Sequence, residues 1–269
     1  MDIAYVISTQ PTRFEAAAFS PDFEPSAAQM AALGYDGIEL AVRDPSQLDV
    51  SAVIQVLEKH HLRVPAIGTG QAFLEEHLSF TDPDETVRNQ AHQRALSHVV
   101  LASQFQALVI IGLLRGRLQP GVQPEQARSW LVSALVSLAR EARARGVRIV
   151  IEPLNRYETN LLNTVSDTLH LIDEVAADNV GVLFDTFHAN IEEPRIEESM
   201  RGCGERLFHV HFADSNRWAP GWGHIDFRSV VKTLREMNYK GWISAEILPK
   251  PDIPHAAEQT IRNMRPILG

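Results

Sequence analysis

The chain is poor in several features that would mark a secreted or membrane protein. Cys203 is the only cysteine among its 269 residues, so no intrachain disulfide can form. No stretch approaches the roughly 20 apolar residues that cross a membrane. The first residues, 1–5, have neither the basic nor the apolar segment of a signal peptide. These absences predict a cytoplasmic protein without a membrane partner, stabilised by its hydrophobic core alone.

Positive charge is also scarce. The chain has 25 basic and 34 acidic residues, for a formal net charge of -9. An acidic surface repels phosphate backbones, so we expect no nucleic-acid partner. A local basic site remains possible.

Short apolar runs alternate with longer helical segments along the whole chain. Apolar runs such as residues 107–112 indicate strands that are buried on both faces, as in a parallel sheet. Eight strands are predicted, at residues 3–8, 35–42, 63–68, 107–112, 147–152, 180–185, 207–212 and 242–247. Helices are predicted at about 25–33, 51–61, 84–104, 124–145, 164–177, 196–203, 227–238 and 254–268. Strict alternation predicts a single (β/α)₈ TIM barrel over residues 1–269.

A doubly wound sheet is the alternative fold. It would place a glycine-rich phosphate-binding turn after the first strand, and residues 8–11 (STQP) offer none. Two long irregular segments, 13–25 and 214–226, follow predicted strands. We therefore expect both of them to lie over the catalytic face of the barrel.

Chemistry in a (β/α)₈ barrel occurs at the carboxyl ends of the strands. Four successive predicted strands end in a carboxylate or an imidazole: Glu152, Asp185, His211 and Glu246. An Asp after a strand can also cap the next helix, and a strand histidine can be a packed core residue. Four in succession nevertheless favour one shared site. The oxygen-rich set suits one divalent metal ion, Mn²⁺ before Mg²⁺ or Co²⁺, with Zn²⁺ less favoured.

The same four residues suggest a type of reaction. A six-coordinate ion would keep two positions for adjacent oxygens of an α-hydroxy ketone, polarise the carbonyl and stabilise an enediolate. Glu152 and Glu246 belong to strands well separated around the barrel, so one could remove the proton next to the ketone and the other return it. Two bases on two faces give epimerisation, and one base that shuttles a proton gives aldose–ketose isomerisation. Spacing alone leaves both outcomes open.

Several motifs resemble those of a known family. Residues 151–158 (IEPLNRYE), 185–188 (DTFH), 211–217 (HFADSNR) and 221–227 (GWGHIDF) are similar to motifs of the D-tagatose 3-epimerase group in the xylose-isomerase-like barrel superfamily. The resemblance covers essentially the whole chain and is most specific over residues 147–246. It implies a homo-oligomer, either a dimer or a tetramer.

The resemblance also implies roles for individual residues. The implied metal ligands are Glu152, Asp185, His211 and Glu246. Glu152 and Glu246 would also form the catalytic acid/base pair. Glu158, His188 and Arg217 would contact the substrate.

Segments 41–46, 66–72 and 109–117 are similar to the 5-keto-L-gluconate epimerase branch, which interconverts this keto acid with D-tagaturonate. This similarity predicts an epimerase of a keto-sugar acid.

The family usually has a carboxylate after the fourth strand, whereas this chain has Arg115 and Arg117. Because arginine binds carboxylates bidentately, either residue could hold the carboxylate of a keto-uronate. Alternatively, both are solvated loop charges.

Other functions remain open at this point. One is a neutral ketose 3-epimerase of the D-tagatose or D-psicose type, and another is an aldose–ketose isomerase such as hydroxypyruvate isomerase. A remote alternative is an endonuclease-IV-like nuclease. That enzyme would need more metal ligands and a basic face for DNA.

Overall fold

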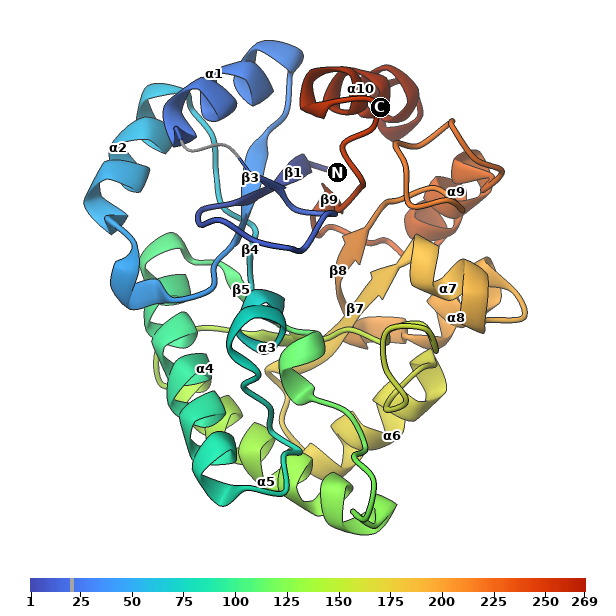
Figure 1. The fold of residues 1–269 in the computed structure, drawn as a ribbon. Helices are drawn as coiled ribbons and strands as arrows, with labels where there is room; N and C mark the ends of the chain where they lie inside the picture. The colour runs from blue at the N-terminus through green and yellow to red at the C-terminus, as the bar shows by residue number, and fades with distance from the viewer. Residues whose placement is uncertain (20–21) are drawn as a thin grey trace.

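The computed structural model describes residues 1–19 and 22–269, and its strands form a closed parallel barrel (Figure 1). The strand order is β1-β3-β4-β5-β6-β7-β8-β9, and β1 also pairs with β9 to close the ring. The strands are β1 (Ile3–Ser8), β3 (Gly37–Ala41), β4 (Ala66–Gly68), β5 (Leu108–Ile111), β6 (Ile149–Ile151), β7 (Val180–Asp185), β8 (Leu207–His211) and β9 (Ile243–Ala245). The predicted (β/α)₈ barrel is therefore confirmed.

Helices surround the ring of strands (Figure 1). The eight predicted helices correspond to α1 (Phe23–Leu33), α2 (Val50–Lys59), α4 (Glu85–Phe105), α5 (Pro124–Arg143), α6 (Val165–Val175), α8 (Ile196–Gly202), α9 (Phe227–Glu236) and α10 (Ile253–Leu268). Aspartates begin many of them: Asp84, for example, caps α4 by accepting a hydrogen bond from the backbone N–H of Thr86. None of the helices in the described part of the chain is long and apolar enough to cross a membrane.

Several short elements were not predicted. Two are the helices α3 (Gly70–Glu76) and α7 (Thr186–Glu192), which begin directly after the carboxyl ends of β4 and β7. The others are the strand β2 (Ala18–Phe19) and the 3₁₀ turns η1 (Pro45–Gln47), η2 (Leu113–Arg115) and η3 (Gly204–Arg206). β2 pairs with the last two residues of β1, within the segment 13–25 that was predicted to be irregular. Residues 20 and 21 of that segment lie outside the described residues.

Side chains alternate between the two buried faces of each strand. In β1, Ile3, Tyr5 and Ile7 belong to the large core between the sheet and the helices. The inner faces of β4 to β7 supply a small apolar core, made of Ala66, Leu108, Ile110, Val150 and Leu183. The inner faces of β3, β8 and β9 instead carry the buried polar residues Glu39, His209 and Ser244. The barrel interior is thus apolar on one side and polar on the other.

Candidate metal centre and active site

The four predicted strand-end residues meet at one point. The Nδ1 atom of His211 lies 3.7 Å from both Glu152 Oε1 and Asp185 Oδ2, and 3.9 Å from Glu246 Oε2. All four side chains are buried, and the most accessible, Glu246, is only 8% exposed. Among the described residues, Glu152 Oε1, Asp185 Oδ2 and His211 Nδ1 have no hydrogen-bond partner. Buried donor atoms that face one another without partners fit a metal ion.

Asp185 serves both a helix and the site. Its Oδ1 atom accepts hydrogen bonds from the backbone N–H groups of Phe187 (2.7 Å) and His188 (3.1 Å) and so caps α7. Its Oδ2 atom is left for the cluster. The sequence left open whether Asp185 caps a helix or belongs to the site. Because its two carboxylate oxygens have different partners, it can do both.

Glu152 depends on a glycine that directly follows the neighbouring strand, β5. It follows the buried residues of β6, and Pro153, which has no backbone N–H, comes directly after it. A Cβ atom on Gly112, beyond the end of β5, would lie 2.8 Å from Glu152 Oε2. Because glycine has no Cβ atom, position 112 leaves room for the Glu152 carboxylate.

His188 lies beside the cluster but has a different hydrogen-bond pattern from His211. The Asn155 side chain accepts from the N–H of Tyr157 through Oδ1 (3.0 Å), so its Nδ2 donates to His188 Nδ1 (2.7 Å). With Nδ1 as an acceptor, the proton of His188 is on Nε2. This atom lies 3.8 Å from Glu152 Oε1 and has no partner among the described residues. His188 therefore offers a hydrogen-bond donor to the site, as its predicted substrate contact requires, rather than a lone pair for a metal.

Arg217 is fixed at the edge of the site. Its Nη1 and Nη2 atoms pair with Glu158 Oε1 (2.6 Å) and Glu246 Oε2 (3.0 Å). Its guanidinium carbon also lies 5.4 Å from the centre of the Phe14 ring and 5.1 Å from that of Phe187. Ion pairs and ring contacts thus hold this cation in place.

The carboxylates of the site are crowded. Burial, and then the charge of Glu246, raise the pKa of Glu152 well above its usual value. Burial raises the pKa of Glu246 to about 6. Burial would also raise the pKa of Asp185, but His188 and His211 lower it to about 2. A divalent cation would relieve this repulsion, and the raised pKa values show how poorly the protein alone compensates it.

A cavity adjoins the cluster at the carboxyl ends of the strands. Glu152, Glu158, Arg217 and Glu246 form its charged side. Phe14 and leucines 74, 113 and 154 supply apolar surface, and α3 contributes Gln71 as well as Leu74. The cavity thus presents a charged side and an apolar side to a small molecule.

Arg115 does not have its predicted role. The side chain is completely buried, and its Nη1 atom donates to the carbonyls of Glu152 (2.6 Å) and Gly112 (3.0 Å). Nε and Nη2 donate to the carbonyls of Leu161 and Leu162, both at 3.1 Å. The prediction that Arg115 binds a substrate carboxylate is wrong, because backbone carbonyls already occupy its guanidinium. Arg115 instead ties the ends of β5 and β6 to the loop before α6.

Arg117 is exposed near the rim of the cavity. Its Nη2 atom donates to the carbonyl of Glu158 (2.5 Å), and its guanidinium lies 5.7 Å from the centre of the Phe73 ring. It is not among the residues that line the cavity. A contact between Arg117 and a substrate carboxylate therefore has no support from its position.

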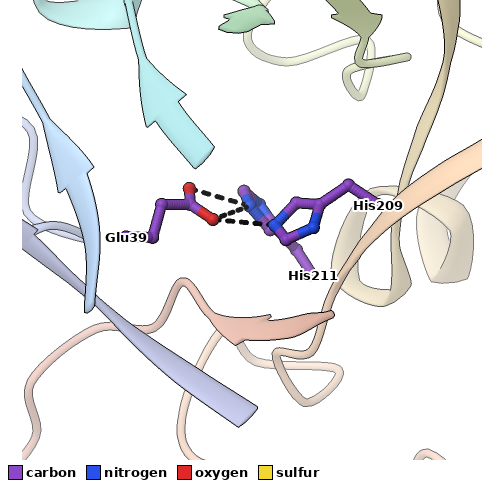
Figure 2. A group of neighbouring side chains, drawn as sticks. All are labelled: Glu39, His209 and His211. Carbon is purple, nitrogen blue, oxygen red and sulfur yellow. Dashed lines mark hydrogen bonds and ion pairs between the residues drawn. The ribbon is translucent and has the colours of Figure 1, made fainter. Parts of the chain in front are cut away.

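Glu39 was missed by the sequence analysis. It lies within β3, is 1% exposed and contacts the imidazoles of His209 and His211 (Figure 2). Strand-end positions alone do not identify Glu39, because it lies two residues before the end of β3. A usable signal was present, because Glu39 separates the apolar Ile38 and Leu40 in a strand buried on both faces.

Comparison with known proteins identifies the family. Residues 27–267 match the model of the xylose isomerase-like TIM barrel family. The chain belongs to this family. An L-ribulose 3-epimerase of Methylomonas sp. (strain DH-1) is 35% identical over 215 residues, which cover 79% of this chain and 74% of the relative. A ketose 3-epimerase of Arthrobacter globiformis is 30% identical over 212 residues, covering 77% and 71%.

A solved structure agrees over nearly the full length. The D-allulose 3-epimerase from Methylomonas sp., in complex with D-allulose, superposes with a TM-score of 0.84 and 27% sequence identity, covering 99% of this chain and 96% of that one. These family relatives are epimerases of sugars. The protein is accordingly an isomerase, as predicted.

Replacing Arg115 with Met tests its structural role. We expect Arg115→Met to lower the free energy of unfolding by about 3 kcal/mol or more, because buried carbonyls lose a charged donor. Arg117→Met, at the exposed position two residues later, should change it by less than about 0.5 kcal/mol. Urea denaturation measures both, and equal stabilities of the two variants would contradict the assignment.

Metal binding should depend on pH in a defined direction. The pKa of Glu246 is raised to about 6 without a metal, so this carboxyl is protonated below that pH and must lose its proton to bind a cation. We expect the affinity for Mn²⁺ to fall as the pH decreases from 7 to 5, with protons released on binding. Calorimetry in buffers of different ionisation enthalpy measures both quantities. A constant affinity over this range would argue against the site.

Proposed function

We propose that the protein is a divalent-metal-dependent 3-epimerase of neutral ketoses, with Mn²⁺ as the preferred metal. The observation that carries the proposal is the buried cluster of Glu152, Asp185, His211 and Glu246, in which Glu152 Oε1, Asp185 Oδ2 and His211 Nδ1 have no partner among the described residues. Three carboxylates and one imidazole form the hard donor set that suits Mn²⁺. The L-ribulose 3-epimerase and the ketose 3-epimerase named above support the reaction and the substrate class.

The two glutamates can act from different sides of a bound sugar. Bound in this cluster, the metal would supply the positive charge that polarises the sugar carbonyl. Glu152 and Glu246 extend from β6 and β9, which are separated by two strands of the ring. One carboxylate takes the proton from C3 while the C–H electrons move into the C2 carbonyl, forming an enediolate. The other carboxylate returns a proton to the opposite face of C3, which inverts that centre.

Neighbouring donors can hold the sugar oxygens during this exchange. The Nε2–H of His188 points into the site and can donate to an oxygen that gains charge as the enediolate forms. Arg217 pairs with Glu246 and so can orient that carboxylate.

The charges of the cavity favour a neutral sugar over the keto-sugar acid that the branch resemblance suggested. Among the described residues that line it, Arg217 is the only cation, and it already pairs with Glu158 and Glu246. A substrate carboxylate would lack a free cationic side chain as its partner, whereas hydroxyl groups need none.

The rest of the lining is suited to a polyol. The Nε2 atom of Gln71 donates to Ser8 Oγ (2.7 Å), and its Oε1 atom has no partner among the described residues. This oxygen can accept a hydrogen bond from a sugar hydroxyl. Leu74 and Leu113 offer apolar surface to the C–H groups of a sugar. The acidic lining and the net charge of -9 also disfavour the nuclease alternative.

The reaction can be tested by proton exchange in D₂O with Mn²⁺. We expect deuterium at C3 and the inverted C3 epimer from D-psicose, D-tagatose or L-ribulose, detected by NMR. D-tagaturonate should react with at least about tenfold lower kcat/KM, because its carboxylate lacks a free cationic partner. Migration of the carbonyl would make the protein an aldose–ketose isomerase, and a preference for D-tagaturonate would restore the keto-acid assignment.

Single substitutions distinguish the two bases. Glu152→Gln and Glu246→Gln should each lower the epimerisation rate by a factor of about 10² to 10⁴, because one face loses its acid/base group. Each variant should still exchange the C3 proton of one epimer, and the two variants should retain opposite epimers. The assay is run with the Mn²⁺ content of each variant measured. Retention of the same epimer by both variants would rule out a base on each face.

A further inference from the structure

Glu39 joins two histidines inside the barrel. Its Oε1 atom lies 3.0 Å from His211 Nε2, and its Oε2 atom lies 2.8 Å from His209 Nε2 and 3.2 Å from His211 Nε2 (Figure 2). The three side chains are at most 1% exposed. Glu39 comes from β3, whereas both histidines come from β8, with β1 and β9 between them in the ring. The carboxylate therefore reaches across the interior of the barrel to the imidazoles.

The hydrogen bonds determine where the proton of His211 lies. A carboxylate has only acceptor atoms, so the Nε2 atom of each histidine must carry the hydrogen that it shares with Glu39. A neutral imidazole protonated at Nε2 has its lone pair on Nδ1. In His211, Nδ1 is the atom that lies 3.7 Å from Glu152 Oε1 and Asp185 Oδ2 and has no hydrogen-bond partner.

We infer that Glu39 is a positioning residue, which fixes His211 in the tautomer and ring orientation that direct the Nδ1 lone pair at the metal. The inference rests on the proposed metal site and adds to it a residue outside the ligand set. Carboxylates that accept a hydrogen bond from a metal-binding histidine also make the imidazole a better electron donor.

Glu39 is itself held in place by His209, which also contacts Ser244. His209 binds the Oε2 atom of the carboxylate, and its Nε2 atom also lies 3.0 Å from Ser244 Oγ. With donors on both oxygens, the carboxylate has one orientation, which sets the position of the His211 ring. His209 is thus separated from the metal site by Glu39 and His211, and its contribution passes through them.

Glu39→Gln is the variant that tests this inference. The carboxamide has nearly the same size, but its NH₂ group can donate to His211 Nε2 and so favour the tautomer with a proton on Nδ1. We expect the Kd for Mn²⁺ to increase about 10- to 100-fold, measured from the electron paramagnetic resonance signal of free Mn²⁺. Thr260→Val is the control, because it removes a fully buried hydroxyl group of α10 that bonds the Ala256 carbonyl and lies outside the strands that carry the site. Its Kd should stay within about twofold of wild type.

The tautomer can be observed directly and without activity. In a ¹H–¹⁵N spectrum of the wild-type protein loaded with diamagnetic Mg²⁺, His211 should show the Nε2–H pattern. Glu39→Gln should shift it toward Nδ1–H. This measurement on wild type also decides the matter if the variant does not fold, since Nδ1–H in the wild type would overturn the inference.

The outcomes separate this inference from the proposed function. Wild-type protein that does not bind Mn²⁺ would refute the metal site itself. Wild-type binding together with an unchanged Kd in Glu39→Gln would refute only the role of Glu39. A loss of thermal stability in that variant at an unchanged Kd would likewise reduce Glu39 to a structural residue.

Discussion

Uncompensated negative charge at the mouth of a closed barrel is the constraint on which the rest of the site depends. Burying a carboxylate is costly unless a cation or hydrogen-bond donors replace its water. Glu152, Asp185 and Glu246 converge where little water can reach. Nearby features reduce the cost: Arg217 pairs with Glu246, and the first turn of α7 binds one oxygen of Asp185. What remains unpaired is the group of atoms that face the proposed ion.

The fold and the convergence of the four strand-end residues could be predicted because the barrel obeys simple rules. Parallel strands all end on the same face, so a list of the residues at strand ends is also a list of neighbours in space. Apolar runs marked the eight strands, and this was enough to bring Glu152, Asp185, His211 and Glu246 together. The elements that escaped prediction are short. A seven-residue helix such as α3 or α7 has too few turns to show a hydrophobic period.

Two side-chain roles could not be predicted for a different reason. Arg115 and Glu39 are both charged residues near strands, and their partners lie far away in the sequence. The carbonyls that bind Arg115 include those of Leu161 and Leu162, 46 and 47 positions later, and His211 is 172 positions from Glu39. Composition and spacing do not reveal whether a charge meets solvent, a ligand or the backbone. Arg115 was therefore assigned to a substrate, while Glu39 was left unassigned.

The two oxygens of the Asp185 carboxylate have different partners, and this links the start of helix α7 to the proposed ion site. One oxygen begins α7 and the other faces the proposed ion, and α7 carries His188, the donor aimed at the same space. Any displacement of Asp185 thus moves the helix start and the donor together. Binding of the proposed ion and the order of α7 would consequently be linked equilibria, and by reciprocity each would stabilise the other. The ion would then prepare the place where the sugar binds, which favours an order of assembly with the ion first and the sugar second.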